Sequence, residues 1–247
     1  MTQDMQATFA RRIALLGADV DAQTTPRLAQ YHALLCDWNT RMNLTGDTSL
    51  DTSLSRLYMD SLAPLVQGSL FPRGSSLVDV GSGAGFPGLP LAIARPDLNV
   101  LLVDSLGKRV AFLRAVIDSL GLTNVEAVHA RAEDAAWHAD YRECFDVAVA
   151  RAVATAPVLL EYLLPFVRVG GHALCYKGPA AEEELDAGTR AAYLLGGGTL
   201  QVIPVTVPEE PDWQHCVLVC KKQRKTSAYF PRKSGLPAKE PLGEERL

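Results

Sequence analysis

The sequence has little of what small secreted, metal-binding or membrane proteins depend on. Its 247 residues contain only five cysteines, none in a C-x-x-C pair, which argues against a zinc ribbon or a thiol redox motif. No apolar run reaches the roughly 20 residues that a membrane-spanning helix needs. The start, Met1–Asp4, lacks the basic and then apolar pattern of a signal peptide. We therefore expect a cytoplasmic protein with reduced cysteines, no bound metal and no membrane association.

Excess charge of one sign is also small. The chain has 24 basic and 28 acidic residues, a net charge of −4. This balance argues against a protein that coats nucleic acid non-specifically, whereas a local basic face is still enough to bind a structured RNA. With 48% hydrophobic residues, a chain of this length can bury most of its apolar surface without disulfides or metals.

Hydrophobic periodicity divides the chain into three parts. Residues 1–67 carry apolar residues at three- and four-residue steps and predict an N-terminal helical cap. Residues 68–222 alternate short apolar runs with amphipathic segments, which predicts a mostly parallel, seven-stranded α/β sheet flanked by helices. The last two runs lie close together, with the segment Pro208–Asp212 between them, so we expect an antiparallel ending. Residues 223–247 form a basic and then Pro- and Gly-rich tail, which we expect to pack on this domain.

The predicted elements of the sheet domain follow one another in regular alternation. The predicted strands are Leu77–Val80, Val100–Val103, Val125–Val128, Val147–Ala150, His172–Tyr176, Leu200–Val205 and Cys216–Cys220. The predicted helices are Leu89–Ala94, Lys108–Leu120, Ala132–His138, Pro157–Phe166 and Ala180–Leu195.

A glycine-rich loop follows the first predicted strand. Gly81, Gly83 and Gly85 allow backbone N–H groups to approach a ligand closely. A dinucleotide fingerprint would need its third glycine at position 86, where this chain has Phe86. Asp79 precedes the loop and offers acceptors to an ammonium group. The pattern favours S-adenosylmethionine, which carries an ammonium group and no phosphate, as the cofactor.

Further candidates follow the next strands. Asp104 ends the second strand at the distance expected of an acid that binds ribose hydroxyls. Ala132 and Glu133 follow the third strand, where backbone or acidic groups can bond the edge of adenine. Arg151 follows the fourth. Seven strands with an antiparallel end are the usual methyltransferase variation of the Rossmann fold, so by this analogy we predict a Rossmann-like class I methyltransferase fold. Because the carboxyl ends of parallel strands meet at one edge of a sheet, we expect its site at that edge.

Several of these residues also have a plainer interpretation. Asp79 and Asp104 are suited to capping the turns beside them. Phe86 is suited to packing on a neighbouring helix, and Glu133, taken alone, to a solvated helix face.

Several short segments spread along the chain form a recognisable set. They are Met42–Thr45, Asp60–Ser61, Val78–Gly88, Ala150–Val153, Leu163–Phe166, Gly170–Gly171, Lys177–Gly178, Tyr229–Lys233, Gly235–Pro237 and Pro241–Leu242. Through them the chain resembles the bacterial 16S ribosomal RNA guanine-N7 methyltransferases, also called glucose-inhibited division protein B, from about Leu34 to Leu242. A glycine loop continued by Phe-Pro-Gly, together with the tail, is specific to this family.

The resemblance implies both the cofactor contacts and the reaction. It implies that S-adenosylmethionine donates a methyl group to N7 of a guanine, nucleotide 527 in the 530 loop of 16S rRNA. The partner is then 16S rRNA or the small ribosomal subunit, and we expect the enzyme to act as a monomer. The sequence departs from the family at Leu57, where a histidine is common, and this leaves the cofactor residues untouched. The residues implied to contact the cofactor are Gly81, Phe86, Ala132, Glu133 and Arg151.

Arg151 is the residue we expect to matter most for methyl transfer. Its guanidinium can hold the cofactor carboxylate, guanine O6 or a phosphate; the alternative is a salt bridge to Asp146 or Glu161. The candidates for RNA contact are Asn43, Arg56, Lys177 and Arg232. Taken singly, each of the three cations is equally explained as an ordinary surface charge, and the asparagine as a side-chain cap.

The sequence also lacks the motifs of other nucleic-acid methylation chemistries. Guanine N7 carries a lone pair and no proton, so alignment and exclusion of water suffice without a general base. The chain has neither the Asp/Asn-Pro-Pro-aromatic segment used on exocyclic amines nor a Pro-Cys or Thr-Cys pair for attack on pyrimidines. Three alternatives remain: a methyltransferase for another substrate, an NAD-dependent oxidoreductase, which Phe86 disfavours, and a non-catalytic RNA-binding or assembly protein.

Overall fold

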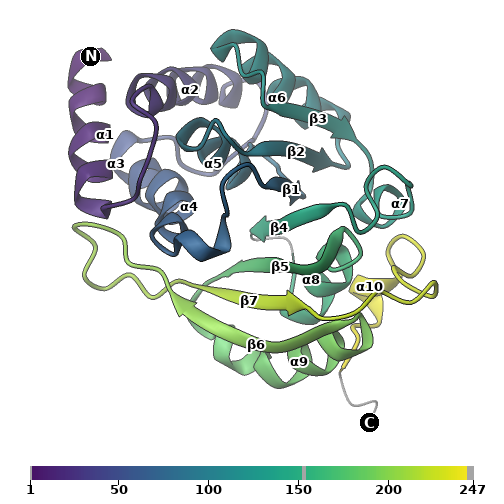
Figure 1. Cartoon of the computed structure of the whole chain (residues 1–247). Coiled ribbons are helices and arrows are strands. Elements are labelled where there is room, and N and C mark those ends of the chain that lie inside the picture. Colours follow the sequence, from purple (N-terminus) through teal and green to yellow (C-terminus); the bar gives the residue numbers. More distant parts are fainter. Residues whose placement is uncertain (1, 152–153, 244–247) are drawn as a thin grey trace.

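In the computed structural model, which describes residues 2–151 and 154–243, one seven-stranded sheet runs through the molecule with helices on both faces (Figure 1). The order of strands across it is β3-β2-β1-β4-β5-β7-β6. The last two residues of the predicted motif 150–153 lie outside the described residues. The strands are β1 (Ser76–Val80), β2 (Asn99–Asp104), β3 (Val125–His129), β4 (Phe145–Arg151), β5 (Val167–Lys177), β6 (Gly197–Pro204) and β7 (Cys216–Lys222).

The direction of the strands confirms the predicted antiparallel ending. Strands β1 to β5 pair in parallel, whereas β7 runs antiparallel to both β5 and β6. The short connection from β6 to β7 leaves no room for the helix that a parallel crossover requires. The strand order reverses between β1 and β4, and open α/β sheets bind ligands at such a switch point.

Helices cover the two faces unequally. The cap and helices α5 and α6 lie on one face, and α7, α8 and α9 on the other (Figure 1). No helix among the described residues is long and apolar enough to cross a membrane. The helices are α1 (Thr2–Leu16), α2 (Thr24–Asn39), α3 (Leu50–Ser53), α4 (Asp60–Leu62), α5 (Gly88–Ala94), α6 (Gly107–Leu120), α7 (Ala132–Ala135), α8 (Ala156–Leu163), α9 (Leu185–Leu194) and α10 (Leu236–Lys239). One π-helix and three 3-10 segments complete them: η1 (Leu54–Met59), η2 (Ala63–Val66), η3 (Gly68–Leu70) and η4 (Pro179–Glu184).

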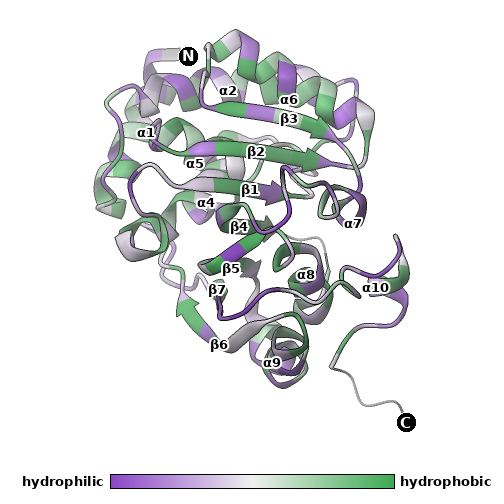
Figure 2. Ribbon diagram, turned by 45° about the vertical axis from the view of Figure 1, so that its right-hand side comes forward, coloured by the Kyte–Doolittle hydropathy of each residue, from purple (hydrophilic) through white to green (hydrophobic). Residues whose placement is uncertain are grey.

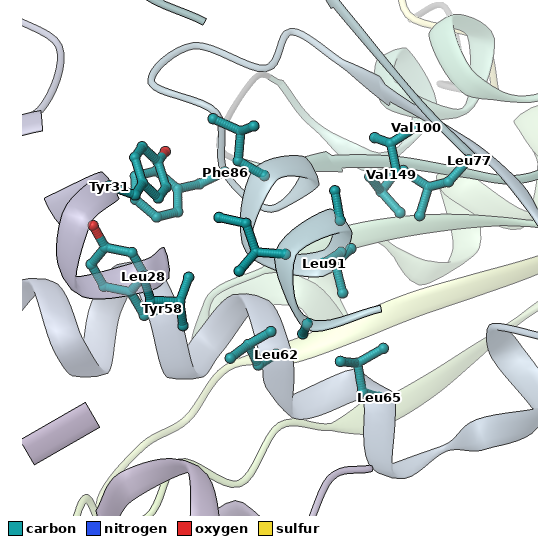
Figure 3. Packing of buried hydrophobic residues seen from close by; sticks show 14 of the residues in the cluster. Leu28, Tyr31, Tyr58, Leu62, Leu65, Leu77, Phe86, Leu91, Val100 and Val149 are labelled. Carbon is teal, nitrogen blue, oxygen red and sulfur yellow. The ribbon is translucent and has the colours of Figure 1, made fainter. Parts of the chain in front are cut away.

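The core lies on both faces of the sheet, as alternating side chains of buried strands require. On β1, Leu77 faces the cap, whereas Val78 and Val80 face α7 to α9. Figure 2 shows the hydrophobic character of the central strands, and Figure 3 the close packing of Tyr31 and Tyr58 from the cap around the α5 region. The helical cap and one face of the sheet therefore share a single hydrophobic core.

Three predicted helices are shorter than their periodicity suggests. The helix predicted over 157–166 already ends at Leu163. The α-helix predicted over 132–138 ends at Ala135, because Trp137 and His138 donate to carbonyls three residues back rather than four. The helix predicted over 180–195 begins as the 3-10 segment η4 and becomes α-helical only at Leu185.

The cap contains a local widening that the sequence pattern does not reveal. Residues Leu54–Met59 form a π-helix, in which the Asp60 N–H donates to the Ser55 carbonyl. The Arg151 side chain and the Ser61 hydroxyl both donate to the Leu57 carbonyl. These competing donors favour the wider turn at this point.

Candidate cofactor and substrate site

The glycine loop leaves β1 in a conformation that favours glycine. The φ angles are +75° at Gly81, +59° at Gly83 and +97° at Gly85. A Cβ at Gly85 would lie 2.7 Å from the hydroxyl oxygen of Tyr31, and that hydroxyl donates to the carbonyl of Ala84. The cap therefore fixes the loop from one side and needs a glycine at position 85 to approach it.

Asp79 lies fully buried beneath this loop. Its Oδ2 accepts a hydrogen bond from the Gly88 N–H at 2.9 Å, which agrees with the capping interpretation. Its Oδ1 is buried without a hydrogen-bond partner among the described residues. Burial raises the pKa of Asp79 to about 7. A buried acceptor without a donor fits the ammonium group of S-adenosylmethionine, so the residues present suit that cofactor.

We expect the affinity for S-adenosylmethionine to rise with pH between about 6 and 7.5. Below about pH 7 the Asp79 carboxyl is mostly protonated in the free protein, whereas an ammonium group binds the carboxylate better. Binding should therefore release a proton and strengthen by at most about tenfold per pH unit. Calorimetry in buffers of different ionisation enthalpy measures both quantities.

Asp79→Asn is the control for this prediction, because it removes the titrating group and leaves any titration of the cofactor amine in place. The variant should bind more weakly at about pH 7.5 and lose most of the pH dependence. An unchanged pH slope in the variant would contradict the role of Asp79.

Asp104 ties the end of β2 to the glycine loop. Its Oδ2 accepts from the Gly83 N–H and its Oδ1 from the Leu106 N–H, both at 2.8 Å. Arg109 lies 3.6 Å from Oδ2. The Asp104 carboxylate thus caps the turn before α6, as the capping interpretation predicts. It also lies against the loop, so the ribose contact remains a prediction.

Substitution of Gly83 can distinguish a backbone requirement for glycine from a requirement set by the bound ligand. A Cβ there would have the carbonyl oxygen of Gly81, 3.9 Å away, as its nearest neighbour, so only the positive φ opposes a side chain. Gly121, at the end of α6, has φ +60° and nothing within 4 Å of a Cβ. We expect Gly83→Ala and Gly121→Ala each to lower the free energy of unfolding by about 1–2 kcal/mol.

Only Gly83→Ala should weaken the binding of S-adenosylmethionine, because Gly121 lies at the opposite edge of the sheet. Urea unfolding and calorimetric titration of both variants test this difference. Equal cofactor affinity in the two variants would remove Gly83 from the site.

Glu133 and Ala132 begin α7, after β3. Glu133 is only 5% exposed, and its Oε1 accepts from the Gly235 N–H at 2.8 Å. The interpretation of Glu133 as part of a solvated helix face is therefore wrong, because the C-terminal tail covers it. Ala132 is partly buried against the core on the same side of the sheet.

Arg151 ends β4 and reaches toward the cap. Its Nη1 lies 3.3 Å from Asp60 Oδ2 and donates to the carbonyls of Arg56 and Leu57. The guanidinium also lies 5.1 Å from the ring centre of Phe86. Arg151 therefore joins the glycine loop to the cap.

The alternative ion pairs considered for Arg151 are wrong. Asp146 pairs with Arg168, and Glu161 pairs with Arg232. Each of these acids pairs with another arginine. Arg151 pairs instead with Asp60 of α4, which is distant from it in the sequence.

Phe86 packs mainly within an aromatic cluster. It is 5% exposed, stacks on Tyr31 at 5.3 Å and meets Tyr58 edge-on at 5.1 Å. Figure 3 shows Phe86 beside Tyr31. Phe86 therefore packs against α2 and η1 of the cap, and a cofactor contact remains a prediction.

A cleft of about 530 Å³ lies on the other side of Arg151. Leu57 contributes an apolar surface to it. The glycine loop does not line this cleft, so Arg151 lies between loop and cleft. The lining residues are Arg56, Leu57, Asp60, Arg151, Ala154, Tyr176, Lys177, Gly178, Pro179, Ala180, Ala181, Glu184 and His215.

The four candidates for RNA contact occupy different surroundings. Arg56 is exposed at the rim of the cleft, and Asn43 is exposed in the loop after α2. Lys177 lines the cleft but is not a solvated lysine, because it pairs with Glu184 at 2.7 Å and its side chain is 10% exposed. Arg232 lies in the tail and pairs with a fully buried acid, which gives its charge a structural role. The structure thus brings Arg56 and Lys177 to Arg151, but not Asn43 or Arg232.

Sequence reasoning gave no role to Asp60, His215 or Trp213. Asp60 is 2% exposed and accepts from His215 Nδ1 at 2.9 Å and from Trp213 Nε1 at 3.2 Å. Asp60 could have been identified from the sequence, because it is a charged residue within the apolar stripe of the cap. No pattern marks the other two, since they lie in an irregular connection between β6 and β7.

Fold and site together define a class I methyltransferase that uses S-adenosylmethionine. Residues 24–211 match the family model of GidB, rRNA small subunit methyltransferase G. The chain belongs to this family, and the resemblance seen in the sequence is confirmed.

Similar proteins cover almost the whole chain. A ribosomal RNA small subunit methyltransferase G of Alkaliphilus metalliredigens is 42% identical over 92% of this chain and 94% of its own length. The methyltransferase G of Alkaliphilus oremlandii is 45% identical over 90% of this chain and 92% of its own length.

Solved structures with lower identity share the fold. A branched-chain polyamine synthase mutein of Thermus thermophilus has a TM-score of 0.58 at 15% identity, over 83% of this chain and 67% of that one. A mutant of MtNAS in complex with S-adenosylmethionine has a TM-score of 0.53 at 16% identity, over 83% of this chain and 80% of that one.

Proposed function

We propose that this protein transfers a methyl group from S-adenosylmethionine to N7 of a guanine in 16S ribosomal RNA, nucleotide 527 of the 530 loop. We further propose that it acts as a monomer in the cytoplasm. The observation that carries the proposal is the place of Arg151, which contacts Phe86 of the glycine loop and lines the cleft. A guanine at the end of the cleft beside Arg151 would face Phe86 of the loop, with a guanidinium within reach of its O6.

The cofactor site uses residues with separate tasks. When bound, S-adenosylmethionine supplies a methyl group on a positively charged sulfur. Asp79 offers an acceptor for the ammonium group, and Asp104 lies where a ribose hydroxyl would bind. Gly83 leaves space for the ligand beside the loop. Ala132 and Glu133 follow β3, at the edge where adenine would lie.

The carboxylates of the cleft suit a reaction that needs no general base. Asp60 is bound to Arg151 and His215, and Glu184 is bound to Lys177. Guanine N7 has a lone pair and no proton, so neither carboxylate has to accept one. The protein then contributes by aligning N7 and by excluding water.

Recognition of RNA would depend on shape and on a few placed cations, since the net charge is −4. Arg56 at the rim and Lys177 in the wall provide two of them. Asn43 remains a proposed contact further out, and Arg232 a proposed contact through the tail.

The test is methyl transfer from tritiated S-adenosylmethionine to small ribosomal subunits and to naked 16S rRNA, both from cells that lack this protein. We expect incorporation at one guanine per 16S rRNA. Subunits from cells that contain the protein are the control, because their site is already methylated. Absence of transfer to both RNA forms, with transfer to a small molecule or protein instead, would overturn the proposal.

A further inference from the structure

One buried carboxylate holds an imidazole at the wall of the cleft. Asp60 lies in α4, and three donors converge on it: Arg151 Nη1 at 3.3 Å from Oδ2, and His215 Nδ1 and Trp213 Nε1 at 2.9 and 3.2 Å from Oδ1. The rings of Trp213 and His215 lie 4.3 Å apart. The imidazole is therefore fixed by both a hydrogen bond and a packed ring.

This arrangement determines what His215 can offer to a ligand. A carboxylate only accepts hydrogen bonds, so Nδ1 carries the proton and Nε2 of the neutral ring is an acceptor. The His215 side chain is 35% exposed and lines the cleft. Within the described residues, no hydrogen bond occupies Nε2. Nε2 is thus a fixed acceptor available to whatever enters the cleft.

We propose that His215, held by Asp60, selects the target base by accepting a hydrogen bond at Nε2 from guanine N1–H. This inference rests on the proposed function. The contacts run from Phe86 through Arg151 and Asp60 to His215, that is, from the glycine loop across the cleft. On the rim of guanine, O6 lies between N7 and N1–H, just as Arg151 lies between the loop and His215. A guanine whose N7 faces the loop and whose O6 faces Arg151 therefore directs N1–H toward His215.

Selection at this edge is needed because N7 does not distinguish the purines. Adenine N7 is also an unprotonated acceptor. Adenine N1, however, is an acceptor and would meet the lone pair of Nε2, which disfavours that base. His215 thus reads N1, one of the positions at which the two purines differ.

The same hydrogen bond should accelerate the reaction. As the bond between N7 and the methyl carbon forms and the carbon–sulfur bond breaks, the guanine becomes a cation and the sulfur becomes neutral. The proton on N1 stays in place but becomes a better donor, so its hydrogen bond to Nε2 strengthens in the transition state. Loss of His215 should therefore lower kcat more than it raises KM.

Two substitutions separate the two nitrogens of the ring. His215→Asn places an amide where Nδ1 lies and keeps the contact with Asp60, but provides no acceptor at the position of Nε2. His215→Gln reaches the position of Nε2. We expect His215→Asn to lose about 10- to 100-fold in kcat/KM on small ribosomal subunits, and His215→Gln to stay within about threefold of the wild type.

The choice of base is the second measurement. Subunits reconstituted with adenine in place of the target guanine should be rejected by the wild type, and His215→Asn should narrow this preference. His138→Leu is the matched control, because His138 also lies beside an aspartate, Asp140 at 3.6 Å, on the exposed surface. It should change neither rate nor preference, and calorimetry should give the same S-adenosylmethionine affinity for every variant.

Equal kcat/KM in the Asn and Gln variants, whether both are high or both are low, would overturn the role of His215. Mass analysis of the product separates this failure from that of the proposed function. If the wild type forms no 7-methylguanine, the proposed function itself fails. If it does and the two variants are equal, only the inference about His215 fails.

Discussion

Arg151→Ala is expected to keep the fold and lower methyl transfer to small ribosomal subunits by about 10²- to 10³-fold, the scale of losing one placed donor at a reacting centre. The fold should survive because Asp60 retains its hydrogen bonds from Trp213 and His215. The loss follows from the position of the guanidinium between Phe86 and the cleft.

Two further variants define this prediction. Arg151→Lys keeps the charge but not the planar fork and should recover only a small part of the activity. Arg168→Ala removes an arginine that pairs with Asp146 at the opposite end of the same strands and should leave activity unchanged. Turnover by Arg151→Ala at the wild-type rate would contradict the role of Arg151, and calorimetry of the variant separates a loss of cofactor binding from a loss of rate.

Arg232→Ala is expected to lower the free energy of unfolding by about 3–5 kcal/mol. Arg232 forms two short contacts, Nη2 at 2.6 Å and Nε at 2.9 Å, with the carboxylate of Glu161. Glu161 is fully buried. Removing the cation leaves a buried charge whose one remaining hydrogen bond among the described residues comes from the backbone N–H at position 232, and such a group is strongly destabilising. Urea unfolding followed by tryptophan fluorescence measures the loss.

The double variant Glu161→Leu with Arg232→Leu is the control, because it removes both charges together. It should regain most of the lost stability. It also tests Arg232 as an RNA contact: methylation of subunits close to the wild-type rate assigns the residue to the structure, and a large loss assigns it to RNA. A loss below about 1 kcal/mol in Arg232→Ala would contradict the importance of this ion pair.

The strands and the cofactor loop could be predicted because their signals are local. Short apolar runs such as 100–103 mark buried strands, and the spacing of Gly81, Gly83 and Gly85 marks the loop. The sheet edge then follows from strand direction alone, which brings Asp104 against Gly83.

The partners of Arg151 on the substrate side could not be predicted because they depend on contacts between distant segments. Asp60, Arg151 and His215 come from the cap, from β4 and from the connection before β7. The pairing of Arg232 with Glu161 likewise joins the tail to α8. In each case a charged side chain had several possible partners in the sequence, and only the packing of the cap and tail on the sheet decided among them.

Above all, we propose that this chain methylates N7 of a guanine in 16S rRNA. The most direct test is mass mapping of 16S rRNA fragments from cells with and without the protein. We predict one guanine, in the 530 loop, that is heavier by one methyl group only when the protein is present, with the methyl on N7. Identical fragment masses in the two cell types, or a methyl group on another atom, would contradict the account.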